Sequence, residues 1–314
     1  MQNKLLNSRP IFDPQDTYTL RGICMIMIMI HHVFKLYSGC PDSIIRWGYL
    51  GVAVFFLISG WGMYCSMFKN NDVTWKYFWK QMKKLLVPYV FIWPLAEILY
   101  VVHHPDYSSA TELARDFFSL TFPPFPGLWF FKVIVIAYAI SIITFILINN
   151  RLGRLIILSL FSVIYYTLAW KILQLPMWWW GTSLCIVAGM WMAAYKDELH
   201  KVYNKKYIIL IFSIVAYYVT FHYNVLPIPS RTIHSFFFAI AILSFGSVFN
   251  IANPILDYIG RNSLLFYLFH IAMCELLVPS MKIFSNQWVA LVFILASTTL
   301  LCFVYNVVKK QLQK

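Results

Sequence analysis

The sequence predicts an all-α integral membrane protein of about ten transmembrane helices, with the N- and C-termini in the cytosol. Three observations lead to this prediction. Apolar residues make up 61% of the 314 residues and charged residues only 12%, which is roughly half the charged share of a soluble domain. The apolar residues gather in runs of about 20, the length that crosses a bilayer as a helix. Lys and Arg gather between alternate runs, as the positive-inside rule describes.

The apolar runs are expected to be helices, because lipid offers no partners to backbone polar groups and a helix pairs them within one segment. A transmembrane barrel would instead show segments of about 10 residues with alternating polarity. The expected spans are residues 20–38, 49–68, 85–102, 128–148, 155–173, 177–195, 207–223, 233–249, 264–281 and 288–308.

The basic residues give the expected orientation. With a cytosolic N-terminus, 18 of the 25 Lys and Arg residues lie on the cytosolic side of the membrane. This excess is typical of cytosolic loops, so it accounts for the net charge of +13 without a nucleic acid partner. We therefore expect a multi-pass protein of the cell's inner (cytoplasmic) membrane, with the lipid bilayer as its main surroundings.

The chain is expected to form a single membrane domain over residues 1–314, with no appended soluble domain. The longest connection between spans, residues 103–127, is too short for a second domain. The first span is expected to be a retained signal anchor, because no convincing small-residue cleavage site follows it. The six cysteines form no C-x-x-C pair, so we expect neither a metal site nor a redox site.

Polar residues inside the first span are the sharpest functional signal, because such groups are costly in lipid. Arg21 begins the span on the cytosolic side, and His32 follows eleven residues later. Eleven helical steps bring the two residues to within about 20° of one face and separate them by about 16 Å along the axis. His31 points about 80° away from that face. The pattern suits a long anionic donor whose charged end meets Arg21 and whose reactive end meets His32. The alternative is that Arg21 is a topology signal and His32 a packing residue.

A basic segment precedes the third span. Lys80 with Lys83 or Lys84 follows the i, i+3, i+4 spacing that lines one helical face. Lysines at a membrane surface bind phosphate groups as point charges, but they also serve topology or attract anionic lipid. The spacing alone does not decide between a phosphate-binding role, a role in topology and binding of anionic lipid.

A polar stripe begins the ninth span. Ser263, Tyr267 and His270 are spaced i, i+4, i+7, which places them on one helical face. Such a stripe faces either a cavity or neighbouring polar helices. Two further carboxylates, Glu97 and Glu275, lie within spans. Either carboxylate is suited to orient His32 or to pair with a cation.

With these residues in view, the chain resembles the acyltransferase family 3 proteins, polytopic membrane enzymes that O-acylate surface glycans and related acceptors. Four motifs carry the resemblance in chain order. Leu20–Ile23 with His32 is similar to the family's Arg and His separated by ten residues. The segment 51–61 is similar to its G-V-x-x-F-F-x-I-S-G-F motif, with Trp for the final Phe. Leu128–Phe130 is similar to its L-W-F motif, and the segment 260–270 to its G-x-x-S-x-x-x-Y-L-x-H helix.

The resemblance implies transfer of a short acyl group, most often acetyl, from cytosolic acyl-CoA to a hydroxyl of a saccharide or lipid-linked saccharide. It implies catalytic roles for His32 and Arg21, and donor binding by Arg21, Lys80, Lys83 and Lys84. Further pocket candidates are Ser59, Trp129, Ser263, Tyr267 and His270. The family's basic motif usually contains Arg, so the lysines here lack its bidentate fork. The donor is expected to be acetyl-CoA or another short acyl-CoA, and no metal is expected.

Two mechanisms stay open at this stage: His32 acts as general base on the acceptor hydroxyl, or it accepts the acyl group covalently. A function of another class also fits the pattern. A transporter or flippase of a lipid-linked or small polar substrate would show ten spans and a basic cytosolic rim, although it gives no reason for the spacing of Arg21 and His32.

Overall fold

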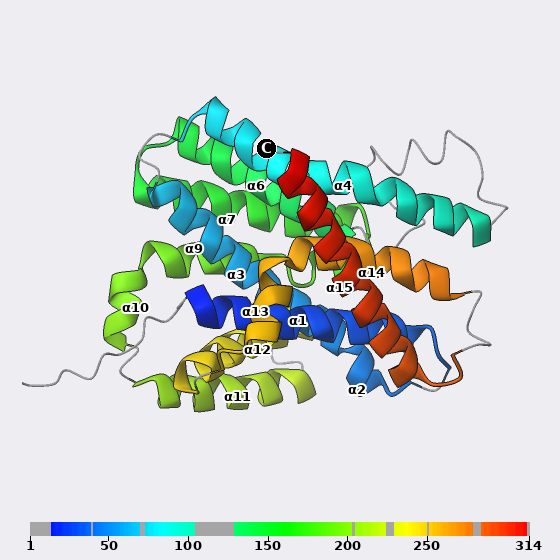
Figure 1. Cartoon of the computed structure of the whole chain (residues 1–314). Helices are drawn as coiled ribbons and strands as arrows, with labels where there is room; N and C mark the ends of the chain where they lie inside the picture. The colour runs from blue at the N-terminus through cyan, green and yellow to red at the C-terminus, as the bar shows by residue number, and fades with distance from the viewer. Residues whose placement is uncertain are drawn as a thin grey trace, which may run out of the picture. The chain divides into compact units, whose positions relative to one another are not determined.

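The computed structural model describes residues 14–38, 40–69, 73–103, 129–202, 205–223, 229–249, 251–278 and 284–312. Within these ranges every regular element is a helix (Figure 1). The helices are α1 (Pro14–Lys35), α2 (Asp42–Ile45), α3 (Trp47–Lys69), α4 (Trp75–His103), α6 (Trp129–Leu147), α7 (Arg151–Thr167), the π-helix η2 (Leu168–Ile172), α8 (Met177–Trp180), α9 (Leu184–Ala194), α10 (Lys196–Val202), α11 (Lys206–His222), α12 (Ser230–Val248), α13 (Pro254–Arg261), α14 (Ser263–Leu277) and α15 (Gln287–Leu312).

The all-α membrane character predicted from the sequence is confirmed. Six helical segments among the described residues are long and apolar enough to cross a membrane, and the bent pair α10–α11 brings the number to seven if it counts as one span. Seven of the ten predicted runs each fall mainly on one long helix. The run 155–173 covers α7 and η2, the run 177–195 is divided between α8 and α9, and the described part of the run 264–281 falls on α14, a shorter apolar helix. The count of ten spans and the cytosolic position of both termini stay predictions.

The chain divides into two compact units, here called unit 1 and unit 2. Helix α1 begins in unit 1 and ends in unit 2, and α6 begins in unit 2 and ends in unit 1. Unit 1 comprises Met1–Cys24, Tyr49–Trp75 and Ala137–Arg261, and unit 2 comprises Met25–Gly48, Lys76–Ile136 and Asn262–Lys314.

In unit 1, α3 and α9 meet backbone to backbone through two glycines. A Cβ at Gly60 would collide with the carbonyl oxygen of Ile186, and a Cβ at Gly189 would collide with that of Leu57. Small residues allow this close approach, which supplies the packing that lipid does not drive by itself. In the same unit, α11 and α12 pack side by side along their length (Figure 1).

Side chains also satisfy the backbone groups at helix ends in unit 1, where each helix leaves several of them without intrahelical partners. Asn150 begins α7 by accepting hydrogen bonds from the amides of Leu152 and Gly153. The guanidinium of Arg154 donates to the carbonyls of Ile148 and Phe145 at 2.5 and 3.3 Å, which closes the end of α6.

The N-terminal half of α1 is held against α13, also within unit 1. The Thr19 hydroxyl donates to the Asp257 carboxylate and accepts from the backbone amide of Asn253 at 3.3 Å. Two glycines, Gly22 and Gly260, bring the helices together, because a Cβ at either would collide with a backbone oxygen of the other helix. This contact fixes the helix that carries Arg21.

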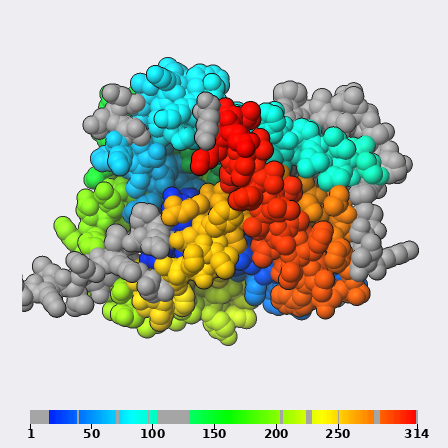
Figure 2. Space-filling model, viewed as in Figure 1, coloured from blue at the N-terminus to red at the C-terminus, as the bar shows by residue number. Residues whose placement is uncertain are grey.

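Unit 2 is built from the end of α1, α2, most of α4, the start of α6, and α14 with α15. The Tyr89 and Phe131 rings stack with centroids 4.3 Å apart and join α4 to α6. Helices α14 and α15 pack together, and Asn306 of α15 donates to the side-chain oxygen of Asn262 at 2.9 Å. The C-terminal end of α15, red in Figure 2, lies beside the cyan α4.

Candidate active site

The end of α1 carries two adjacent histidines with different surroundings. The Nδ1 atom of His31 lies 2.5 Å from the carbonyl oxygen of Ile45, the last residue of α2. A carbonyl oxygen only accepts, so Nδ1 of His31 carries the proton. Gly48 leaves the space for this ring, because a Cβ there would collide with it. His31 is therefore fixed to the start of α3 and the end of α2.

His32 lies between two other imidazoles. Its ring centroid is 5.0 Å from that of His31, with the planes at 81°, and 5.3 Å from that of His270 on α14, with the planes at 58°. The side chain is half-buried. The structure thus brings together two residues, His32 and His270, that lie far apart in the sequence.

His270 is the most enclosed of the three histidines. Its side chain is 0% exposed, and its Nδ1 atom lies 3.0 Å from the carbonyl oxygen of Phe266 one turn earlier. No set of three His, Cys, Asp or Glu side chains among the described residues is arranged to hold a metal ion. The His32 ring contacts the rings of both other histidines.

Aromatic side chains wall the cluster on the α14 side. The Tyr267 ring lies 5.4 Å from the His270 ring and 4.8 Å from the Phe130 ring of α6. Phe130 in turn contacts Trp129 with ring centroids 6.1 Å apart. Tyr267, Phe130 and Trp129 are all buried. Tyr267 therefore links the His270 ring to the buried aromatic residues of α6, and hydrogen bonds in such a setting of low polarity are stronger than in water.

A cavity of about 600 Å³ lies in the same unit, between α4 and α15. Lysines from both helices line it, Lys83 and Lys84 from α4 and Lys309 from α15. The remaining lining residues are apolar apart from Tyr305; they are Val87, Pro88, Phe91, Val308 and Leu312. The cavity therefore combines positive charge with apolar walls, which suits a molecule that has both an anionic and an apolar part.

The family match decides what kind of protein has these sites. Residues 19–307 match the family model Acyl_transf_3, described as an acyltransferase domain. The chain belongs to the acyltransferase 3 family. This membership confirms the resemblance that the four motifs indicated. No curated protein and no solved structure gave a significant match.

As a member of the acyltransferase 3 family, the protein is a membrane acyltransferase, and it requires an acyl donor. Among the residues predicted to act on that donor, Arg21 lies half-buried on α1. Its Nε atom is buried and has no hydrogen-bond partner within the described part of the chain. A Cβ at Gly62 of α3 would lie 3.7 Å from its Nη2 atom. Arg21 therefore keeps one donor that the described residues do not use, and its predicted contact with an anionic donor stays a prediction.

The structure also gives the positions of three other predicted site residues, Lys80, Ser263 and Ser59. Lys80 is an exposed residue of α4 that does not line the cavity of Lys83 and Lys84. Ser263 is the first residue of α14, two turns before His270, and is half-buried. Ser59 lies on α3 and is half-buried.

The two intramembrane carboxylates lie on α4 and α14, and their predicted roles toward His32 or a cation stay predictions. Glu275 follows His270 by five residues, which places it about 140° around α14 from that ring. Glu97 is a buried residue of α4, at 4% exposure. Lys132 of α6, one of the seven basic residues that the predicted topology places outside the cytosol, is also buried at 7% exposure. A buried charge in a membrane helix is itself a functional candidate.

The polar residues of the lysine cavity that sequence reasoning missed are Tyr305 and Lys309. Their spacing of four residues places them on one face of α15. The sequence shows that these two residues share a face, but not that this face packs beside α4. A basic residue at a helix end is also expected from the positive-inside rule alone, so it did not indicate a site.

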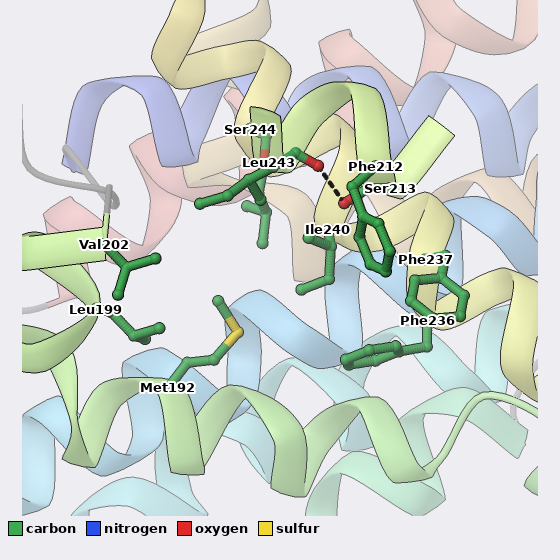
Figure 3. A pocket seen from close by; sticks show the side chains of 11 residues that line it. Met192, Leu199, Val202, Phe212, Ser213, Phe236, Phe237, Ile240, Leu243 and Ser244 are labelled. Carbon is green, nitrogen blue, oxygen red and sulfur yellow. Dashed lines mark hydrogen bonds between the residues drawn. The ribbon is translucent and has the colours of Figure 1, made fainter. Parts of the chain in front are cut away.

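A second cavity, of about 310 Å³, lies in unit 1 between α9, α10, α11 and α12 (Figure 3). Its lining residues are Met192, Leu199, Val202, Ile209, Phe212, Ser213, Phe236, Phe237, Ile240, Leu243 and Ser244. None of them is titratable, and the Ser213 hydroxyl donates to the Ile209 carbonyl at 2.7 Å. This cavity offers no acid, base or cation for acyl transfer, so of the two cavities described the lysine-lined one in unit 2 is the candidate donor site.

Proposed function

We propose that this acyltransferase moves a short acyl group, acetyl in the simplest case, from cytosolic acyl-CoA to a hydroxyl of a glycan or another cell-surface acceptor. The observation that carries the proposal is the position of His32. Its half-buried ring lies between two imidazoles, in the same unit as a cavity lined by lysines and apolar residues. One unit thus holds a candidate base and a candidate donor site.

The donor has a charged end and a reactive end. Coenzyme A carries its phosphates at one end, where the ammonium groups of Lys83, Lys84 and Lys309 are suited to hold them as point charges. Val87 and Phe91 offer apolar surface to the pantetheine arm. Arg21 is a further proposed phosphate contact, on the sequence evidence of its helical face. Lys80 does not line the cavity, so its proposed contact with the donor rests on its helical spacing alone.

His32 supplies the chemistry in either of two routes. As a general base it takes the proton of the acceptor hydroxyl, the oxygen attacks the thioester carbonyl, the C–S bond breaks, and the proton passes to the thiolate. Alternatively, an unprotonated nitrogen of His32 attacks the thioester carbonyl, the C–S bond breaks, and the thiolate leaves with the proton of the other ring nitrogen. The acceptor hydroxyl then takes the acyl group from His32 and leaves its proton on the ring. Trapping an acyl adduct on His32 without acceptor would favour the second route.

The proposal places the donor inside and the acceptor outside the inner membrane. The chain then crosses the bilayer ten times as a single domain, with both termini in the cytosol, in line with the distribution of Lys and Arg. The acceptor is a saccharide or lipid-linked saccharide that reaches the acyl group from the outer side.

The experiment uses membranes from cells that express the protein and radiolabelled acetyl-CoA. Label should pass from acetyl-CoA to an acceptor in the membranes, and His32→Ala should lower the rate by about 10²–10⁴-fold. The matched variant is His31→Gln at the neighbouring imidazole, which we expect to cost far less because His31 hydrogen-bonds the backbone and points elsewhere on the helix.

Two outcomes would contradict the proposal. If His32→Ala, present at normal levels, transfers label as fast as the wild type, the base lies elsewhere. If the wild type transfers no label from acetyl-CoA or from longer acyl-CoA, the proposed donor is wrong. A mass shift of one acetyl group on the surface glycan of producing cells would identify the acceptor.

A further inference from the structure

A buried hydrogen-bond acceptor on His270 is not used by anything described so far. Because its Nδ1 atom faces the carbonyl oxygen of Phe266, Nδ1 carries the proton and Nε2 has a lone pair. This Nε2 atom is buried and has no hydrogen-bond partner within the described residues. Buried polar atoms are nearly always paired, so an unpaired one calls for an explanation.

The neighbour best suited to supply the missing donor is His32. The two ring centroids are 5.3 Å apart, which leaves room for one N–H···N hydrogen bond between the rings and for no group in between. The planes are tilted by 58°, so a rotation of the half-buried His32 ring about its side-chain bonds would bring one N–H to face Nε2. His31 is less suited, because its Nδ1 proton already lies against Ile45.

We propose that His270 is a positioning residue for His32, an inference that rests on the proposed function. Its Nε2 atom accepts the N–H of His32 and thereby selects one neutral tautomer, in which the other ring nitrogen of His32 is unprotonated. In acid–base triads an orienting group likewise sets the tautomer and stabilises the imidazolium that forms. Here the orienting group is a neutral imidazole whose own tautomer is fixed by a backbone carbonyl.

The proton movements balance in the general-base route. The acceptor hydroxyl gives its proton to the free nitrogen of His32, the new O–C bond forms, and the C–S bond of the thioester breaks. His32 then carries two N–H groups, one of which stays bonded to Nε2 of His270. The transferred proton passes to the thiolate of coenzyme A, so His32 returns to its neutral state. His270 neither gains nor loses a proton.

The test compares two substitutions of His270 in the full-length protein, assayed in native membranes with radiolabelled acetyl-CoA. We expect His270→Leu, which has no acceptor, to lower the maximal rate roughly 10–100-fold, the usual cost of losing a group that orients another. The apparent KM for acetyl-CoA should not change. His270→Gln should retain most of the rate, because its side-chain oxygen accepts a hydrogen bond. Cys274→Ala, one turn further along α14 and also buried, is the matched control and should transfer at the wild-type rate.

A wild-type rate for His270→Leu would overturn the inference. Equal losses for His270→Leu and His270→Gln would overturn it too, because they would assign His270 to packing or to direct contact with a substrate. If His270→Leu does not fold, nitrogen NMR of ¹⁵N-histidine in the wild type replaces it. A single neutral tautomer at His32, assigned from the His32→Ala spectrum, supports the inference, and a mixture of tautomers contradicts it.

The failure of this inference is distinguishable from the failure of the proposed function. A His32→Ala variant with normal activity would contradict the proposed function. An inactive His32→Ala variant together with a fully active His270→Leu variant leaves the function standing and removes only the role given to His270.

Discussion

The two ends of α1 are held by different kinds of contact. Near its start, in unit 1, the helix backbone touches α13 directly, through Gly22 against Leu256 and Gly260 against Tyr18. Near its end, in unit 2, the helix is surrounded by rings, with His32 between His31 and His270. The helix contact at the first end depends on glycines, which have no side chain to keep the backbones apart. The contacts at the second end are made by imidazole side chains.

This difference separates stability from activity along one helix. Backbone contacts leave no room for an added methyl group, whereas a ring can be replaced by a ring of similar size with little change in packing. Substitutions at the first end should therefore lower the amount of folded protein. Substitution of His32 at the second end should leave the folded protein intact and remove acyl transfer.

The largest expected effect follows from adding side-chain atoms at the first end. Gly260→Val would place a Cβ against the carbonyl oxygen of Tyr18, and backbone cannot move aside as a flexible side chain does. We expect little or no folded protein, measured by size-exclusion chromatography of a fluorescent fusion. Gly62→Ala is the control, because its Cβ would meet only Arg21 Nη2 at an ordinary 3.7 Å. A Gly260→Val variant with the wild-type Tm would show that the two helices are not in backbone contact.

The next largest effect concerns chemistry alone. His32→Phe keeps a planar ring between the two imidazoles but removes both nitrogens, so we expect a nearly unchanged Tm and a transfer rate lower by about 10²–10⁴-fold. Radiolabel transfer and thermal unfolding measured on the same preparation check both parts. If His32→Phe instead lowers the Tm strongly, or leaves no folded protein, then His32 is a structural residue, like the glycines at the other end of the helix.

Many of the candidate site residues could be predicted from the sequence, because the spacing of residues on one helix is a local property. The positions of Arg21 and His32 on one helix, the face shared by Ser263, Tyr267 and His270, and the lysines at the start of α4 all follow from spacing alone. The helices that coincide with the predicted runs follow from apolar length.

Other features depend on which helices meet, and spacing does not give that. Nothing local links His270 to His32, or Lys309 to Lys83, because these pairs come from helices far apart in the chain. The burial of Lys132 was likewise not predicted, because it depends on which helices surround that residue. The glycine contact between Gly22 and Gly260 was missed for the same reason.

The lysine cavity supplies a prediction of intermediate size. Lys309→Gln removes one of the three ammonium groups around the proposed phosphate site, and we expect the apparent KM for acetyl-CoA to rise by about tenfold, the value of one hydrogen bond to a charged group. The maximal rate should stay the same, because the lysine does not contact the reacting atoms. The adjacent Lys310→Gln is the matched control, since Lys310 does not line the cavity. Equal effects of the two variants would point to a general surface charge effect.

The smallest expected effect tests the polar contact at the first end of α1. Thr19 is 0% exposed, and its hydroxyl both donates to Asp257 and accepts from the amide of Asn253. Thr19→Val keeps the shape but removes both bonds, so the free energy of unfolding should fall by about 1–2 kcal/mol, measured by SDS titration in mixed micelles.

A double-mutant cycle decides whether the Thr19 bond itself is responsible. Asp257→Asn keeps an acceptor oxygen but removes the charge, so it should cost less stability than Thr19→Val. The double variant should cost less than the sum of the two, because residues that share a hydrogen bond couple. Strictly additive costs would mean that Thr19 and Asp257 act separately, and that the glycine contacts alone hold this end of the helix. Acyl transfer by the folded fraction should remain normal in all three variants, since no atom of this pair belongs to the histidine cluster.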